Sequence, residues 1–219
     1  MSTAVVGSSV SRRDGALKVT GQARYAADHP LEHVAHAVAI CSTIANGRVS
    51  HIDSSAVESA PGFLAIIHHG NAPRLSRPVN NFESASKPGE IRVVFEDDRV
   101  HYAGQYIAVV VAETLQQAQH AAELVTVTYE TRPPAIDTEQ AMDTLYDPAE
   151  FFGEKLAARR GEPESAFQQA EVTHEADYVT PVEHHNPMEP SASIAHWDGD
   201  ELTLYETAQW VVGARNTVA

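Results

Sequence analysis

The side chains best suited to chemistry lie near the end of the chain, in the sequence His184-His185-Asn186-Pro187-Met188-Glu189-Pro190. Imidazole and carboxylate groups are ligands for zinc or iron, so His184, His185 and Glu189 could form the metal set of a zinc hydrolase. Pro187 disfavours the helix that would align His185 with Glu189, and the HExxH arrangement is absent from the sequence. We therefore expect no direct metal ligand in this chain.

Gln209 is a second candidate, in the sequence Thr207-Ala208-Gln209-Trp210 that follows a strand-like segment. The amide of a glutamine can donate hydrogen bonds to a ligand without adding a charge. From its spacing alone, however, Gln209 is an ordinary glutamine at the end of a strand.

Charge and cysteine content exclude several classes of function. The chain has 15 basic and 30 acidic residues, a net charge of −15, which disfavours nucleic acid or an anionic membrane as a partner. Cys41 is the one cysteine in the sequence, so the chain alone can form neither a disulfide nor a cysteine-ligated iron–sulfur cluster. Any electron-transfer centre must lie on another polypeptide. We expect Cys41 itself to be a buried thiol, because it ends an apolar run.

The sequence carries no signal for secretion or membrane insertion. Residues 1–10 lack a charged segment followed by an apolar one, and no window approaches the length and hydrophobicity of a membrane span. These features favour the cytoplasm.

The elements that position these residues follow from hydrophobic periodicity. Residues 12–28 lack a period and predict a loop or short strands, and proline, asparagine and serine predict a long loop over 71–90. Ser55 with Glu58, and Thr114 with Gln117, have the spacing of capping boxes and predict two helix starts. Alternating or apolar runs predict strands at 33–43, 63–67, 91–95, 106–111 and 126–129, and the order strand, helix, strand from 106 onward suggests a βαβ-type unit.

The second half of the chain has weaker periodicity. Residues 133–162 read as a linker, followed by a short helix over 163–170. Strands are expected at 172–179, 191–197 and 202–205, with Asp198-Gly199-Asp200 as a hairpin turn between the last two. A helix is expected to begin near Gln209.

Several motifs together resemble one family, the molybdenum hydroxylases. The resemblance is to the opening portion of the molybdopterin-binding large subunit of xanthine dehydrogenases and aldehyde oxidases, and it covers nearly all of this chain. Beyond the cluster that ends at Pro190 and the Gln209-Trp210 pair, it rests on Arg13-Asp14-Gly15, Lys18-Val19-Thr20-Gly21, Arg24-Tyr25 and Gly104-Gln105. The glycines among them are expected to serve turns rather than catalysis.

The resemblance implies a mixed α/β fold in four parts. Residues 1–20 are an opening segment, 21–132 an α/β hammerhead domain, 133–162 a linker and 163–219 the incomplete start of a molybdopterin-binding domain. It also implies an enzyme that hydroxylates an aldehyde or N-heterocycle with water as the oxygen source.

Particular residues receive roles from this resemblance. Gln209 would hydrogen-bond an oxo group of the molybdenum centre, while His185 and Glu189 would be structural residues that orient the pocket. The family's catalytic glutamate lies beyond this stretch, so no catalytic residue is expected here and the chain alone should be inactive.

Cofactors and partners follow in the same way. The resemblance implies a molybdenum–pterin cofactor, in its dinucleotide form, shared with the remaining portion of the subunit. Iron–sulfur clusters and FAD would be carried by partner chains in an obligate complex, which a signal-bearing partner could export to the periplasm. A non-catalytic assembly subunit that keeps the hammerhead is the alternative interpretation, and the substrate stays open.

Overall fold

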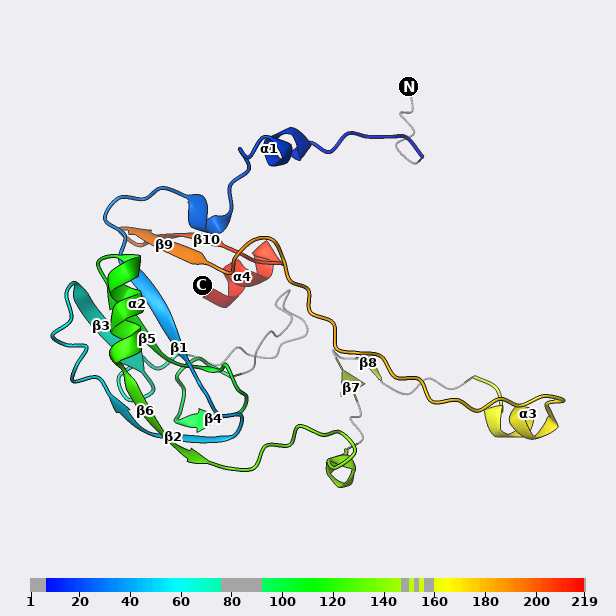
Figure 1. Ribbon diagram of the computed structural model, residues 1–219. Helices are drawn as coiled ribbons and strands as arrows, with labels where there is room; N and C mark the ends of the chain where they lie inside the picture. The colour runs from blue at the N-terminus through cyan, green and yellow to red at the C-terminus, as the bar shows by residue number, and fades with distance from the viewer. Residues whose placement is uncertain (1–6, 76–91, 147–149, 152–153, 156–159, 219) are drawn as a thin grey trace.

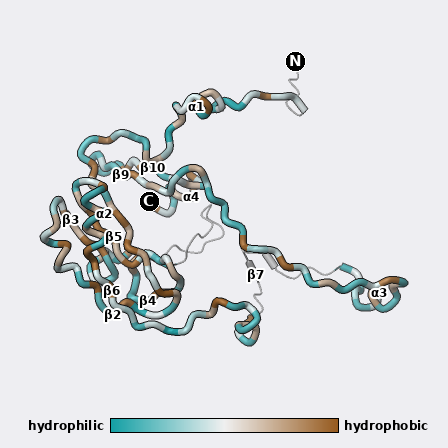
Figure 2. Tube along the Cα trace, in the orientation of Figure 1, coloured by the Kyte–Doolittle hydropathy of each residue, from teal (hydrophilic) through white to brown (hydrophobic). Residues whose placement is uncertain are grey.

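The computed structural model describes residues 7–75, 92–146, 150–151, 154–155 and 160–218 (Figure 1). One packed body holds two sheets and a helix, and a separate hairpin lies beside it (Figure 1). Figure 2 shows hydrophobic residues gathered in the strands of this body, with isolated hydrophobic positions along the extended segment that leads away from it. Among the described residues no helix has the length and apolar character needed to cross a membrane.

The first sheet has three antiparallel strands in the order β1-β5-β3. These are β1 (His36–Cys41), β5 (Tyr106–Ala112) and β3 (Phe63–His68). The central strand β5 is built of valine, alanine and isoleucine and buries Ile107 and Val110, as expected of a β-branched run with neighbours on both sides. The strands predicted here from sequence are confirmed.

Helix α2 (Leu115–Leu124) packs on this sheet through Ala118 and Ala121, which are fully buried. Thr114 begins it, since its hydroxyl accepts a hydrogen bond from the Gln117 backbone N–H at 3.3 Å. The same hydroxyl donates to Oε1 of Gln117 at 2.9 Å. The predicted helix start is therefore confirmed, with the glutamine side chain bound to the hydroxyl.

The second sheet has the order β4-β2-β6 and closes a small core with the first. Its strands are β2 (Gly47–Asp53), β4 (Arg99–Val100) and β6 (Thr126–Thr131). Val49 and Val100 from this sheet pack with Ile107 from the first. Because α2 connects β5 of one sheet to β6 of the other, the predicted βαβ-type unit does not place its two strands side by side in one sheet.

Several sequence predictions are corrected by the structure. Residues 54–60 form turns rather than a helix, because Oδ1 of Asp53 binds both the backbone N–H and the hydroxyl of Ser55. Residues 92–95 form a bend and a turn rather than a strand, and Phe95 has a φ of 60°.

Ile91 and most of the predicted 71–90 loop fall outside the described residues. The segment 12–28 contains a helix, α1 (Gly15–Val19), and a 3₁₀ turn, η1 (Ala26–Asp28).

Cys41 is exposed rather than buried. It lies at the end of β1, where side chains alternate between half-buried and exposed, and Ile40 takes the inward position. The expectation of a buried thiol was therefore wrong, because Cys41 lies one residue beyond the last inward-facing position of β1.

The C-terminal part contains the predicted hairpin, β9 (Ser193–Asp198) with β10 (Glu201–Glu206), followed by α4 (Val211–Val218). Helix α3 (Pro163–Gln169) lies far from the packed body, and the chain returns from it to β9 along an extended path (Figure 1). Residues 172–179, predicted as a strand, are extended and exposed but pair with no strand in the part of the chain that the structure describes. Short elements β7 (Glu150–Phe151), β8 (Glu154–Lys155) and η2 (Met142–Thr144) lie between the two parts.

Candidate functional site

Glu189 joins the segment ahead of β1 to the C-terminal hairpin. Its Oε1 accepts a hydrogen bond from the backbone N–H of Ala26, in η1, at 2.8 Å. The same oxygen accepts from the hydroxyl of Thr207 at 3.2 Å. Ala26 is buried, so the carboxylate satisfies a backbone donor that would otherwise lose its water. Glu189 therefore connects three segments that are distant in the sequence.

Thr207 extends the hairpin beyond β10 by pairing with Ala192, through one backbone hydrogen bond and one hydrogen bond to its hydroxyl. Its N–H donates to the carbonyl oxygen of Ala192 at 3.2 Å, and its hydroxyl accepts from the N–H of Ala192 at 3.4 Å. The carbonyl oxygen of Pro190 lies 3.2 Å from the same hydroxyl. The chain that leaves β10 is thus fixed at its first residue.

A ring contact strengthens the same junction. His29, directly after η1, stacks on Tyr205 of β10 with ring centroids 4.1 Å apart and an angle of 25° between the planes. Together with the Ala26–Glu189 bond, this contact places η1 against the hairpin.

Gln209 lies between the end of β10 and the start of α4. Its side chain is exposed and forms no hydrogen bond with any residue that the structure describes. One residue later, the Trp210 ring lies so close to Gly213 that a Cβ there would be 2.2 Å from Cε3 of the indole. A neutral amide with its donors available, on a short segment held at both ends, fits a ligand that offers oxo oxygens.

The two histidines of the predicted metal set do not meet Glu189 in a ligand cluster. His184 and His185 are exposed, and Asn186 has a φ of 39° that interrupts any helix ahead of Pro187. Among the residues that the structure describes, no group of three histidine, cysteine, aspartate or glutamate side chains could hold a metal ion. The zinc-hydrolase hypothesis therefore has no ligand set in this part of the chain.

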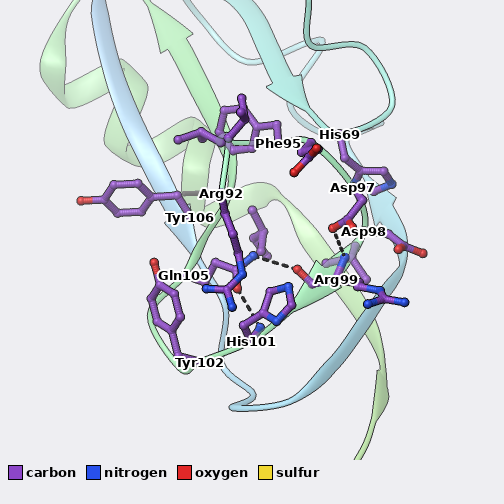
Figure 3. Close-up of a pocket in the computed structure, with 15 residues that line it drawn as sticks. His69, Arg92, Phe95, Asp97, Asp98, Arg99, His101, Tyr102, Gln105 and Tyr106 are labelled. Atoms are coloured by element: carbon purple, nitrogen blue, oxygen red, sulfur yellow. Dashed lines mark hydrogen bonds between the residues drawn. The ribbon is translucent and has the colours of Figure 1, made fainter. Parts of the chain in front are cut away.

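A cavity of about 270 Å³ in the packed body was not predicted from sequence. Its wall includes Gln105, whose amide donates to the Arg99 carbonyl oxygen and whose Oε1 accepts from the His101 N–H, both at 2.7 Å (Figure 3). Asp98 in the same wall pairs with Arg48. Gln105 thus stabilises the turn between β4 and β5, and its amide and the Asp98 carboxylate are both bound within the protein.

Local surroundings shift the pKa of several side chains in the first half of the chain. Hydrogen bonds from Arg12 and Lys18 lower the pKa of Asp14 to about 2. Hydrogen bonds from Ser55 lower the pKa of Asp53, and burial followed by the charge of His69 lowers the pKa of His68. These shifts follow from local structure and do not identify a catalytic acid or base.

Two family models match the chain. Residues 20–133 match the model described as aldehyde oxidase and xanthine dehydrogenase, a/b hammerhead domain. Residues 147–219 match the molybdopterin cofactor-binding domain, so the matched region contains Glu189, Thr207 and Gln209. The predicted division at 20–21, 132–133 and 162–163 stays a prediction.

Curated relatives agree with these matches. The molybdenum-binding subunit PaoC of an aldehyde oxidoreductase from Escherichia coli is 37% identical over 217 residues, which are 98% of this chain and 28% of PaoC. Subunit gamma of the 6-hydroxypseudooxynicotine dehydrogenase complex from Paenarthrobacter nicotinovorans is 30% identical, over 91% of this chain and 26% of its own length. This chain therefore spans less than a third of the length of either relative.

Solved structures show the same fold. Quinoline 2-oxidoreductase from Pseudomonas putida 86 matches 97% of this chain and 28% of its own, with a TM-score of 0.74 and 24% identity. An aldehyde oxidoreductase from Desulfovibrio gigas matches 88% of this chain and 22% of its own, with a TM-score of 0.69 and 24% identity. The predicted fold class, a hammerhead domain followed by the start of a molybdopterin-binding domain, is confirmed.

Proposed function

Because the chain belongs to the aldehyde oxidase and xanthine dehydrogenase family, we propose that it is part of a molybdenum hydroxylase that oxidises an aldehyde or an N-heterocycle with water as the oxygen source. The observation that carries the proposal is the similarity to PaoC, a molybdenum-binding subunit, through both parts of the chain. The match to the molybdopterin cofactor-binding domain supports a share in the cofactor pocket.

Gln209 would hold the cofactor. Its amide Nε2 would donate a hydrogen bond to an oxo oxygen of the molybdenum centre, and its neutrality would leave the charge beside the metal unchanged. The exposed side chain and its lack of a hydrogen-bond partner among the described residues support this role. When bound, the cofactor supplies the two-electron oxidation, and the protein binds and orients it.

Glu189 and His185 would support the pocket without reacting. One oxygen of Glu189 is already engaged by Ala26 and Thr207, which supports a structural role for the carboxylate. His185 is exposed, and we propose that it packs against the remaining portion of the subunit in the assembled enzyme. The general base of the reaction would come from that remaining portion.

An exposed apolar segment supports the need for a further domain or chain that covers it. The extended path between α3 and β9 carries large hydrophobic side chains that are more than 80% exposed, namely Val172, Tyr178, Val179, Val182 and Met188. Exposed apolar surface of this kind marks a contact with another chain or domain. We propose that the remaining portion of the molybdopterin subunit covers it, with an iron–sulfur subunit and an FAD subunit completing the complex.

The composition of the purified complex tests this proposal. The tagged chain is purified from its own cells, and the complex is assayed for molybdenum, for the pterin dinucleotide and for oxidation of aldehydes and N-heterocycles. We expect about one molybdenum per chain, and activity that falls strongly in Gln209→Ala. A complex with no cofactor, or with cofactor and activity unaffected by Gln209→Ala, would instead favour the assembly-subunit interpretation.

A further inference from the structure

The hydroxyl of Thr207 lies among more acceptors than it can serve. Oxygen atoms of Glu189, Pro190 and Ala192 lie 3.2, 3.2 and 3.3 Å from it. A threonine hydroxyl has only one hydrogen to donate, so its hydrogen bond goes to the strongest of these acceptors. The Ala192 carbonyl already accepts from the Thr207 N–H, and Glu189 offers the charged oxygen, so the hydroxyl donates its hydrogen bond to Glu189.

This choice completes a chain of contacts. Oε1 of Glu189 accepts hydrogen bonds from both the Thr207 hydroxyl and the Ala26 N–H, so the carboxylate links Thr207 to η1. The hydroxyl also accepts from the Ala192 N–H, which fixes its orientation from the other side. Few alternative positions remain for Thr207.

Gln209 lies two residues beyond this fixed point. The connection between β10 and α4 consists of residues 207–210, and its last residue, Trp210, is joined to α4 because its carbonyl oxygen accepts a hydrogen bond from the Ala214 N–H at 3.0 Å. Because the connection is only four residues long, the position of the Gln209 backbone depends on the position of Thr207.

We propose that Thr207 is a positioning residue for the cofactor contact, whose hydroxyl aims the Gln209 amide through its hydrogen bond to Glu189. The inference rests on the proposed role of Gln209. Thr207 does not touch the cofactor, so its loss acts through Gln209 and leaves substrate binding intact. Groups that orient a direct ligand contact typically change affinity or activity by about 10- to 100-fold when removed.

Isosteric substitution in the purified complex tests the proposal. Thr207→Val keeps the shape and removes the hydroxyl, whereas Thr207→Ser keeps the hydroxyl. We expect Thr207→Val to lower kcat about 10-fold with KM unchanged, and to shift the molybdenum EPR signal of the reduced complex as Gln209→Ala does. We expect Thr207→Ser to restore both.

A double variant separates positioning from general stability. If Thr207 acts through Gln209, Thr207→Val in the Gln209→Ala background has no further effect on kcat or on the EPR signal. Hydrogen–deuterium exchange of peptides covering 23–29 should rise in Thr207→Val and stay normal in Thr207→Ser, because Glu189 loses one of its two partners.

The outcomes that overturn the inference differ from those that overturn the proposed function. An unchanged kcat and EPR signal in Thr207→Val, or a multiplied loss in the double variant, overturns the positioning role while the role of Gln209 stands. A Gln209→Ala complex with normal kcat and signal overturns both. If Thr207→Val does not assemble, Glu189→Gln removes the charged acceptor at the same size and must show the same non-additivity with Gln209→Ala.

Discussion

The carboxylate of Glu189 accepts a hydrogen bond at 2.8 Å from the backbone N–H of Ala26, which lies 163 residues earlier in the chain. This contact ties the segment that precedes the hammerhead strands to the hairpin of the cofactor-binding region. The two matched domains are therefore joined at a residue of the motif that made the family resemblance visible.

Removal of this carboxylate should release η1. Glu189→Ala leaves the buried Ala26 N–H without its acceptor, and hydrogen bonds to charged groups contribute about 1.5–3 kcal/mol. We expect the exchange rate of the Ala26 amide to rise at least about 10-fold, measured by hydrogen–deuterium exchange of peptides covering 23–29. Glu175→Ala, at an exposed position, is the control and should leave this rate unchanged. Equal protection in both variants would contradict the contact.

Val110 should contribute strongly to the stability of the packed body. Its side chain is fully buried in β5 against Val57 and Ala121, so Val110→Ala removes apolar contacts and leaves a cavity. We expect the free energy of unfolding to fall by about 2 kcal/mol in urea titrations. Val19→Ala, where the valine is 86% exposed, should change it by less than about 0.5 kcal/mol. Similar losses in the two variants would show that Val110 is not in the core.

Gly47 occupies a position that only glycine can fill. Its φ is 148°, and a Cβ there would lie 2.1 Å from the backbone oxygen of Glu130 on the neighbouring strand β6. Because a backbone atom cannot move aside, we expect Gly47→Ala to cost about 3 kcal/mol or more of unfolding free energy. Gly104 also has a positive φ, 88°, but open space around it, so Gly104→Ala should cost only about 1–2 kcal/mol. A smaller cost at Gly47 than at Gly104 would refute this account.

His68 should make the stability depend on pH. Burial and then the charge of His69 lower its pKa below the ordinary value of 6.5, and its Nδ1 accepts a hydrogen bond from the Gly70 N–H at 3.1 Å. The unfolded chain therefore takes up a proton at higher pH than the folded one, and stability falls as the pH drops through the ordinary value. NMR titration should give a lowered pKa for His68 that rises in His69→Ala. An unchanged pKa in that variant would remove His69 as a cause.

Local patterns predicted the elements that have a strong local signal in the sequence. The strand over 106–111 follows from an apolar, β-branched run, the helix begun by Thr114 from a capping hydroxyl, and the hairpin around Gly199 from a turn dipeptide. The helix predicted from Ser55 does not form, because the Ser55 hydroxyl, which could have capped a helix, instead donates a hydrogen bond to Asp53 in a turn. The alternation over 172–179 misled because a strand also requires a partner, which spacing cannot supply.

The sequence predicted which residues form the candidate site but not the hydrogen bonds that join them. Gln209 and Glu189 were expected from the family resemblance, but no spacing rule relates Glu189 to a backbone N–H that lies 163 residues away. The sequence gives no signal for Thr207, because a threonine after a strand has no distinctive chemistry until its three acceptors are seen together in the structure.

The most direct test of the account is the molybdenum content of the complex purified through this chain, with and without Gln209. We expect about one molybdenum per chain and one pterin cofactor in the natural complex. In the same preparations, Gln209→Ala should lower the kcat per bound molybdenum by at least about 10-fold. Gln119→Ala, at an exposed glutamine on α2, should match the natural chain in both molybdenum content and kcat. A well-assembled complex that holds neither molybdenum nor pterin would contradict the central claim.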